Sequence, residues 1–282
     1  MTAPNGAAEQ SEDDNVTESP GINTAVPQSA RIWNYWLGGK DNYPVDRAAG
    51  DQYIEVFPGV VDIARASRGF LTRAVAYLAG EAGVRQFLDI GTGLPTADNT
   101  HEVAQRVAPD SRIVYVDNDP LVLAHARALL TSTPVGVTAY IHADLRDPDA
   151  ILAEAGKTLD FGQPVALMLM GILGHVTEYE EARSIVRRLL DGLPSGSYFA
   201  LNDGTNVISK EFVAAQEGYN QSGAVPYVLR SPEQIAGFFE GLELVEPGVV
   251  SCPRWRADSA TVDASGGLPA ELDAFGGVGR KR

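Results

Sequence analysis

Short apolar runs alternate with amphipathic stretches along the chain from residue 84 onward. The runs have the length and β-branched content of buried strands, and they predict strands at 85–90, 112–117, 137–142, 164–170, 197–202 and 242–250. A last strand within 272–281 is predicted to return beside 242–250. Apolar positions at helical spacing predict helices near 97–107, 120–131, 148–156, 178–191, 207–217 and 232–240. Such alternation predicts an α/β fold whose parallel sheet is covered by helices.

The chain before residue 84 shows helical spacing without a predicted strand. Two helices are expected at 45–56 and 60–80, and a short aromatic cluster occupies Arg31–Leu37. Residues 1–28 are rich in small, polar and acidic residues, and the first basic residue is Arg31. Such a segment buries too little apolar surface to order itself. We therefore expect a flexible acidic tail at 1–28, an N-terminal helical cap at 29–83 and a core at 84–282.

The composition narrows the class of protein. The 282 residues include 22 Lys and Arg against 37 Asp and Glu, a net charge of −15, which argues against a nucleic-acid partner. The single cysteine and the scattered histidines have no metal-ligand spacing, so no metal is expected. No secretory signal is visible, and the longest apolar run, Val165–Leu173, is too short to span a membrane. These features predict a soluble, cytoplasmic protein.

A glycine turn follows the first predicted strand. Asp89, Gly91, Thr92 and Gly93 lie between that strand and a helix expected from residue 97, and glycine lets a backbone approach a ligand closely. A dinucleotide-binding turn has a third glycine, where this chain has Thr96. The Asp-x-Gly-x-Gly form resembles motif I of the Rossmann-like S-adenosylmethionine-dependent methyltransferases. A tight turn in another kind of α/β protein is the alternative.

Acidic residues also end the next two predicted strands. Asp117 is placed to accept hydrogen bonds from both hydroxyls of a ribose, and Asn118 to flank an adenine. After the third strand, Asp144 can accept from an adenine amino group while the Leu145 amide donates to a ring nitrogen. Each acid alone is typical of a loop or a helix cap. Because ligands bind at the carboxyl ends of the strands in such sheets, these acids and Asp89 together predict an S-adenosylmethionine site.

A closer resemblance covers residues 29–281. The segments that carry it are 30–43, 87–96, 115–120, 143–148 and 276–281, including the run Leu-Gly-Gly-Lys-Asp-Asn-Tyr at 37–43. They resemble the actinobacterial S-adenosylmethionine methyltransferase family of unknown substrate. The resemblance implies a Rossmann-like class I methyltransferase fold, with a mostly parallel seven-stranded sheet, helices on both faces and an N-terminal helical cap. It also implies S-adenosyl-L-methionine as cofactor, and it names no substrate.

The helices before the first strand of class I methyltransferases close over the cofactor. Tyr43, Trp33 or Trp36 can therefore present a ring to the sulfonium, whose positive charge favours an aromatic face. Arg68 is a candidate to pair with the methionine carboxylate. The alternative for the tryptophans is a place in the core, and Arg68 is equally compatible with a structural role.

The fourth predicted strand brings the last candidates. Met170 and Gly171 are expected to line the methionine end of the cofactor, and His175 is the candidate general base, with a structural role as its alternative. Asn202 and Asp203 resemble the acid–amide pair of metal-dependent O-methyltransferases, but that class also needs an acid where this chain has Met170 and Gly171. We interpret the pair as turn formers or as polar groups on the substrate side.

Three functions remain open at this stage. The first is a methyltransferase acting on a small-molecule acceptor, because orientation in a closed site can suffice for methyl transfer. The second is a non-catalytic regulatory protein that binds S-adenosylmethionine or S-adenosylhomocysteine. The third is a nicotinamide oxidoreductase, which Thr96 disfavours. The oligomeric state stays open.

Overall fold

The computed structural model describes residues 23–129, 131–257 and 267–282, so the expected tail lies mostly outside the described residues. The α-helices are α1 (Ser29–Trp36), α2 (Pro44–Val56), α3 (Val60–Gly80), α4 (Thr100–Val107), α5 (Pro120–Leu129), α6 (Pro148–Ala155), α7 (Tyr179–Asp191), α8 (Lys210–Asn220) and α9 (Pro232–Gly237). The strands are β1 (Gln86–Ile90), β2 (Arg112–Asp117), β3 (Val137–His142), β4 (Ala166–Met170), β5 (Tyr198–Gly204), β6 (Glu243–Leu244), β7 (Val250–Ser251) and β8 (Ala274–Arg280). Short 3₁₀ helices follow β4 (Leu173–His175) and β7 (Cys252–Arg254).

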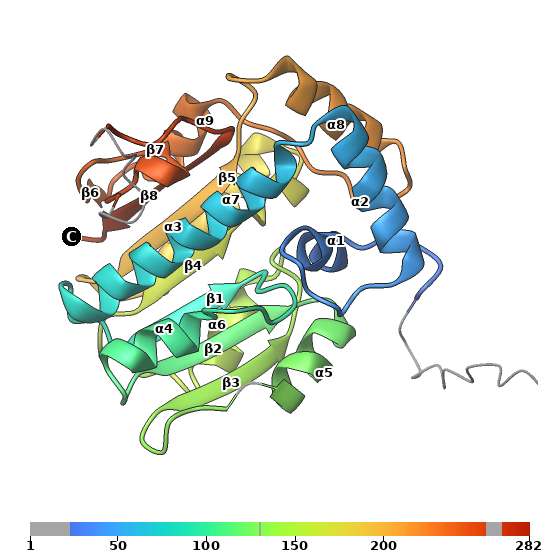
Figure 1. Ribbon diagram of the computed structural model, residues 1–282. Coiled ribbons are helices and arrows are strands. Elements are labelled where there is room, and N and C mark those ends of the chain that lie inside the picture. The colour runs from blue at the N-terminus through green and yellow to red at the C-terminus, as the bar shows by residue number, and fades with distance from the viewer. Residues whose placement is uncertain (1–22, 130, 258–266) are drawn as a thin grey trace, which may run out of the picture.

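The strands form one mixed sheet (Figure 1). Its main path runs β3-β2-β1-β4-β5-β8-β6, and β7 also pairs with β8. The strands from β1 to β5 pair in parallel, whereas β8 is antiparallel to β5, β6 and β7. The predicted Rossmann-like class I fold is confirmed, and so is the return of the last strand beside the 242–250 region.

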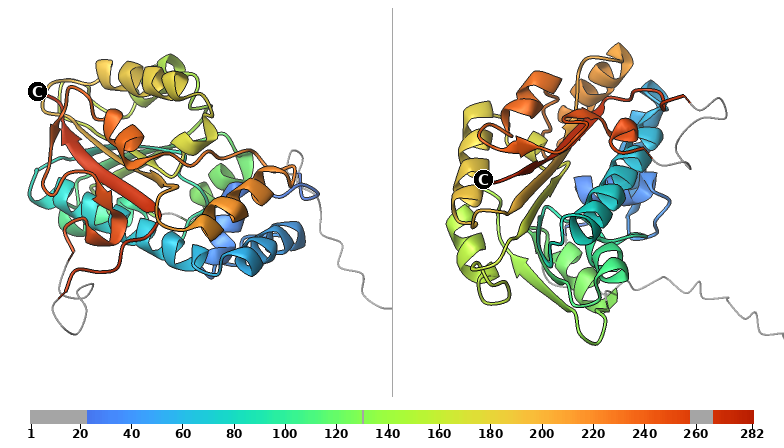
Figure 2. Two further views of the ribbon diagram at one scale, coloured as in Figure 1. Left: turned by 90° about the horizontal axis from the view of Figure 1, so that it is seen from above. Right: turned by 90° about the vertical axis from the view of Figure 1, so that its left-hand side faces the viewer.

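Helices cover both faces of the sheet because successive strand residues point to opposite sides (Figure 2). Phe87 packs with α3 and α4 residues in one core cluster. Leu88 and Ile90 belong to the other cluster, which holds apolar residues of α6, α7 and α9. These two clusters make the sheet a buried middle layer, and the strand ends are left to carry polar groups.

Parallel pairing brings the carboxyl ends of the central strands to one edge. Ile90, the last residue of β1, pairs with Val116 of β2, and Met170, the last residue of β4, pairs with Asn202 of β5. The turn after β1 and the loop after β4 therefore meet at the place where strand order reverses, between β1 and β4. This is the crevice in which open α/β sheets bind ligands.

Two predicted elements differ in the structure. The helix expected from residue 97 begins at Thr100, because Asp98 has a φ of 57° and Asn99 forms a capping box with Glu102. The strand expected at 242–250 is split into β6 and β7, with Pro247, which has no N–H to donate, between them. Both differences arise from local backbone chemistry that an apolar pattern does not report.

The described residues just before the N-terminal cap contact it. Arg31 on α1 donates hydrogen bonds to the carbonyl oxygens of Asn23 (3.1 Å) and Val26 (2.7 Å). Asp46 on α2 accepts from the Gln28 N–H (2.9 Å) and pairs with Arg31. Residues 23–28 are thus attached to the cap. Among the described residues, no helix is long and apolar enough to cross a membrane.

Candidate functional site

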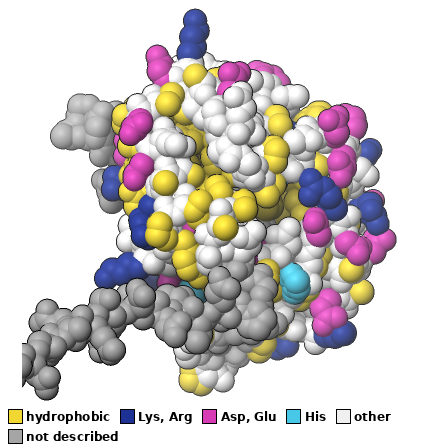
Figure 3. Space-filling model, turned by 90° about the vertical axis from the view of Figure 1, so that its right-hand side faces the viewer, with side chains coloured by type: hydrophobic (Ala, Val, Ile, Leu, Met, Phe, Trp, Pro, Cys, Tyr) yellow, Lys and Arg dark blue, Asp and Glu magenta, His cyan; other side chains and the backbone are white. Residues whose placement is uncertain are grey.

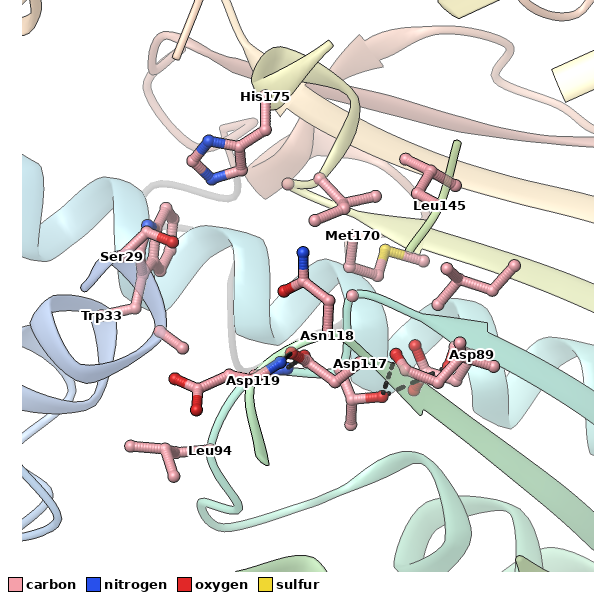
Figure 4. Close-up of a pocket in the computed structure, with 18 of the residues that line it drawn as sticks. Ser29, Trp33, Asp89, Leu94, Asp117, Asn118, Asp119, Leu145, Met170 and His175 are labelled. Carbon is pink, nitrogen blue, oxygen red and sulfur yellow. Dashed lines mark hydrogen bonds between the residues drawn. The ribbon is translucent and has the colours of Figure 1, made fainter. Parts of the chain in front are cut away.

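A cavity of about 220 Å³ lies where the cap meets the carboxyl ends of β1, β2 and β4 (Figure 4). We call it the first cavity. Its lining comes from 28–37 around α1, 64–71 on α3, the turn after β1, and the segments 116–119, 143–146 and 170–176. The space-filling view of the side that carries α1, α2 and α8 shows hydrophobic side chains across the middle and charged ones mainly at the periphery (Figure 3).

The turn after β1 needs both of its glycines. Gly91 and Gly93 have φ angles of +74° and +66°, in the left-handed region that side chains disfavour. A Cβ on Gly91 would also lie 2.5 Å from the Ile172 side chain. The Thr92 hydroxyl closes the turn by donating to the Asp89 carbonyl oxygen (3.2 Å). The turn therefore presents bare backbone to the first cavity.

Asp89 is a buried carboxyl group at the base of this turn, 3% exposed. Its Oδ2 accepts a hydrogen bond of 2.6 Å from the Thr100 hydroxyl at the start of α4. Burial raises the pKa of Asp89 to about 6, while the Thr100 bond and the positive charge of Arg68 oppose that rise. The group therefore carries a negative charge at neutral pH at an energetic cost to the fold.

Asp117 at the end of β2 holds the turn in place. Its two oxygens accept from the backbone N–H groups of Gly93 (3.0 Å) and Asp119 (2.9 Å). Burial raises its pKa, and these backbone hydrogen bonds oppose the rise. Each carboxylate oxygen has more than one lone pair, so Asp117 keeps capacity for hydroxyl donors. The exposed Asn118 side chain extends into the first cavity (Figure 4).

The segment after β3 forms another wall. Asp144 is exposed and accepts from the Arg146 N–H (2.8 Å), whereas the Leu145 side chain is buried. Within the described residues the Leu145 N–H has no hydrogen-bond partner. The structure therefore brings Asp144, Leu145 and Asn118 to the same cavity, with a backbone donor still open.

Arg68 on α3 lines the first cavity opposite the carboxyl groups. In the part of the chain that the structure describes, its guanidinium makes neither a hydrogen bond nor an ion pair. Burial lowers its pKa, and the nearby charge of Asp89 opposes this. An arginine stays charged in proteins, so Arg68 is an available cation within the cavity.

The three aromatic candidates of the cap lie in different places. Trp33 lines the first cavity, as expected for a ring that faces a ligand. Tyr43 does not line it, because its ring packs with the Leu94 cluster and stacks against Arg31, 5.2 Å from the guanidinium carbon. Trp36 is a buried core residue, and it reaches a neighbouring cavity instead.

That neighbouring space, which we call the second cavity, measures about 50 Å³ and adjoins the first. Six residues line both cavities: Ser29, Trp33, Ser67, Gly171, His175 and Asn202. The other walls come from α2, α3, α8 and the segment around Tyr227. Sequence reasoning missed the aromatic residues that α2 and α8 contribute, because on amphipathic helices they look like ordinary core.

The loop after β4 lies at the junction of the two cavities. Met170 and Gly171 line the first cavity as expected, and the Gly171 N–H donates to the Asn202 carbonyl oxygen (2.8 Å). His175 lies on the same side of the cavity as Trp33 (Figure 4). Its ring packs edge-on against Tyr227, with ring centroids 5.1 Å apart.

The surroundings of the His175 ring show which of its nitrogens carries the hydrogen. Nδ1 lies 3.0 Å from the Pro226 carbonyl oxygen, which only accepts, so Nδ1 carries the hydrogen. Burial is the main cause that lowers the pKa of His175, so the ring is neutral at pH 7 and Nε2 holds a lone pair. Among the described residues, Nε2 has no hydrogen-bond partner. His175 can therefore accept a proton at the junction of the cavities.

The described residues contain no group of three or more His, Cys, Asp or Glu side chains that could hold a metal ion. Asp203 in β5 is instead buried and makes polar contacts with other side chains. It accepts a short hydrogen bond from the Tyr227 hydroxyl and lies 3.4 Å from the Arg230 guanidinium. Asn202 lines both cavities, and Asp203 lines the second.

Comparisons with known proteins agree with this geometry. The S-adenosyl methyltransferase family model matches residues 15–282. A DUF574 family protein from Streptomyces avermitilis is 48% identical, with a TM-score of 0.84, and the match covers 92% of this chain and 99% of that one. A candidate methyltransferase from Thermobifida fusca is 40% identical, with a TM-score of 0.85 and coverage of 95% and 99%.

More distant structures share only the fold. An O-methyltransferase family protein from Burkholderia thailandensis is 15% identical, with a TM-score of 0.51, and the match covers 74% of this chain and 55% of that one. No curated protein matches the sequence. The family match spans the described cap and sheet and the cavity between them. The chain therefore belongs to the S-adenosyl methyltransferase family.

Proposed function

We propose that this protein transfers a methyl group from S-adenosylmethionine to a small-molecule acceptor. One observation carries the proposal: the first cavity, at the strand ends, adjoins a second cavity and shares six lining residues with it. A donor in the first and an acceptor in the second would meet at His175, Gly171 and Asn202. Holding two reactants in contact in this way supplies much of the rate enhancement of a group transfer.

The residues of the first cavity fit the proposed cofactor. The bare turn at Gly91–Gly93 and the carboxylate of Asp117 suit a ribose with two hydroxyl donors. The Leu145 N–H, which has no hydrogen-bond partner among the described residues, and the exposed carboxylate of Asp144 suit the two edge groups of an adenine. A buried Thr96 hydroxyl also lines this cavity without a partner in the described chain. These open polar groups support an adenosyl ligand.

The charges of the first cavity suit a methionine group better than a pyrophosphate. Arg68 is an available cation for the methionine carboxylate, and Asp89 is a carboxylate for its ammonium group. A pyrophosphate would instead face several acidic side chains: Asp89, Asp117, Asp119 and Asp144. This balance disfavours a nicotinamide dinucleotide.

In this mechanism the chain provides orientation, exclusion of water and a proton acceptor. When bound, the sulfonium of S-adenosylmethionine supplies an activated methyl group. Trp33 would offer a ring face toward that positive charge. Nε2 of His175 would take the proton that an O–H or N–H acceptor loses as it gains the methyl group. The cap would close over both reactants.

Isothermal titration tests the cofactor assignment. We expect micromolar binding of S-adenosylmethionine and no binding of NAD. Asp117→Ala should weaken binding by about 2 kcal/mol, because a ribose loses two hydrogen bonds and the turn loses its Gly93 contact. Asp110→Ala, at an exposed position in the turn before β2, is the matched control. Absence of S-adenosylmethionine binding to the wild-type chain would contradict the proposal.

A second experiment tests turnover. The protein is incubated with donor labelled in its methyl group and with an extract of small metabolites, and labelled products are separated and identified. Transfer of label into a small molecule supports the enzyme. Binding of the donor with no transfer to any fraction would instead support a non-catalytic regulatory protein that senses S-adenosylmethionine or S-adenosylhomocysteine.

A further inference from the structure

The walls of the second cavity are mainly aromatic. Rings contact one another edge-on along the cavity: Trp33 with Trp36 (centroids 5.9 Å apart), Trp36 with Tyr53 (5.1 Å) and Tyr53 with Tyr219 (6.2 Å). Phe212 adds a further ring, 6.2 Å from Tyr53. Because aromatic pairs favour edge-to-face and offset geometries, such walls suit a flat apolar guest.

Two polar atoms in these walls are buried without a partner among the described residues. They are Oδ1 of Asn202, a residue that is 2% exposed, and the hydroxyl of Tyr219. Neighbouring polar groups are satisfied, since Tyr53 donates to Gln216 (3.1 Å) and Tyr227 donates to Asp203. A buried polar atom without a hydrogen bond is costly and rare. The two open atoms therefore point to a ligand with polar groups of its own.

The charge around the second cavity excludes an anion. No lysine or arginine lines it within the described chain. Asp203 does line it, and its charge is paired with Arg230 behind it, 3.4 Å away. A carboxylate or phosphate placed here would lose its hydration without gaining a cation, which is strongly unfavourable.

We propose that the second cavity receives an uncharged aromatic acceptor whose O–H or N–H group donates a hydrogen bond to Oδ1 of Asn202. The inference rests on the proposed methyl transfer and names the class of its acceptor. The hydroxyl of Tyr219 offers a second hydrogen bond. The cavity of about 50 Å³ is smaller than the roughly 150 Å³ that encloses benzene in another protein. The second cavity therefore encloses only part of an aromatic ring, and the rest of the acceptor extends toward the residues that both cavities share.

Binding of simple ring compounds tests this proposal without turnover. The protein is saturated with S-adenosylhomocysteine, and tryptophan fluorescence, to which Trp33 and Trp36 of the cavity walls contribute, is followed as p-cresol, p-toluidine, toluene or p-toluate is added. We expect p-cresol or p-toluidine to bind about fivefold more tightly than toluene, the worth of one hydrogen bond. Equal binding of toluene, or tightest binding of the p-toluate anion, would overturn the proposal.

Two variants assign the hydrogen bonds. Asn202→Leu should abolish the preference over toluene, and the milder Tyr219→Phe removes only an oxygen and should reduce it. Tyr77→Phe is the control, because Tyr77 packs on Tyr198 and lines neither cavity. A wild-type preference retained in both test variants would overturn the assignment. Titration of S-adenosylhomocysteine into each protein separates this result from a failure of the cofactor site.

Discussion

Several side chains at the site reduce the stability of the folded protein. Asp89 is buried with a raised pKa, the Arg68 guanidinium makes no hydrogen bond or ion pair in the described chain, and Asn202 leaves a buried oxygen without a hydrogen bond there. Each of these groups costs free energy in the folded protein unless a ligand compensates it. Proteins commonly accept such costs at functional sites and offset them elsewhere. The site is therefore marked by unsatisfied residues rather than by a distinctive motif.

The cost of Asp89 can be measured through pH. Its pKa is about 6 in the folded chain, above the value near 4 of an unfolded aspartate. Between these values the unfolded state binds fewer protons, so stability from this group falls as pH rises through the window. We expect urea unfolding to show Asp89→Asn more stable than wild type at pH 7, by up to about 3 kcal/mol.

The advantage of Asp89→Asn should shrink as the pH approaches 4, where the carboxyl group is protonated in the folded state and about half protonated in the unfolded state. Asp110→Asn, whose side chain is 66% exposed, is the matched control and should change stability little at either pH. An advantage that stays the same at pH 7 and pH 4 would contradict the assigned burial penalty.

A second prediction for a single residue concerns His175 and the pH dependence of the rate. Burial lowers its pKa, so the base form dominates at neutral pH. The rate of methyl transfer should rise with pH through a value below 6.5 and level off above pH 7. His175→Gln should remove this dependence and lower kcat about 100-fold, because a general base contributes at least that much.

Steady-state kinetics with the methyl-labelled donor and the acceptor identified by the turnover experiment checks the role of His175, together with titration of S-adenosylmethionine. The variant should keep the cofactor affinity of the wild type, and His125→Gln on α5, which lines neither cavity, should keep its rate. A variant that transfers methyl groups at the wild-type rate would leave His175 with a structural role only.

Among the elements, the cap and α8 complete the site that the sheet begins. α1 supplies residues to both cavities, and α2 contacts α8 through the Tyr53–Gln216 hydrogen bond. Ser209 caps α8 by accepting from the Phe212 N–H (3.1 Å). The second cavity thus exists only because helices far apart in the sequence meet over the strand ends.

That origin explains what the sequence could predict. The turn at Gly91–Gly93 and the acid at Asp117 were found because strand, turn and helix follow each other locally. The aromatic walls were not found, because Tyr53 and Gln216 are 163 positions apart and periodicity carries no such pairing. The predicted start of α4 was wrong because of a local feature, the φ of 57° at Asp98, which the apolar pattern does not indicate. Tyr43 matched a family pattern, but its ring lies outside the cavity.

For the secondary-structure elements, the buried ion pair between α1 and α2 gives a testable prediction about stability. Arg31 and Asp46 are 1% and 0% exposed and lie 3.0 Å apart. Arg31→Met leaves a buried carboxylate uncompensated, so we expect stability to fall by about 3 kcal/mol. Urea unfolding measures this loss, and hydrogen exchange should quicken in α1 and α2.

An ion pair on the surface provides the comparison. Arg65→Met breaks an exposed i,i+3 pair with Asp62 on α3 and should cost well under 1 kcal/mol. Addition of Asp46→Asn to Arg31→Met removes the uncompensated charge and should recover part of the lost stability. If the double variant were less stable than Arg31→Met, the charge would not be the cause.

The whole molecule joins two adjoining cavities, one lined by charged residues and one mainly by aromatic residues, to an acidic exterior. The net charge of −15 disfavours anionic macromolecules as partners, and the described residues gather apolar side chains on the side that carries the cap. The first cavity takes its walls from both the cap and the core sheet. A ligand in that cavity therefore contacts parts of the chain that otherwise meet only through side-chain packing.

This arrangement predicts that the cofactor product couples cap and core. At 100 times its dissociation constant, S-adenosylhomocysteine should stabilise the protein by about 2.7 kcal/mol, since it binds the folded state only. Hydrogen exchange should slow both in 28–37 of the cap and in the turn after β1, because both line the first cavity. NAD serves as the control ligand and should change neither segment. Protection confined to the core turn would show that the cap does not close over the ligand, and the proposed exclusion of water would then need another source.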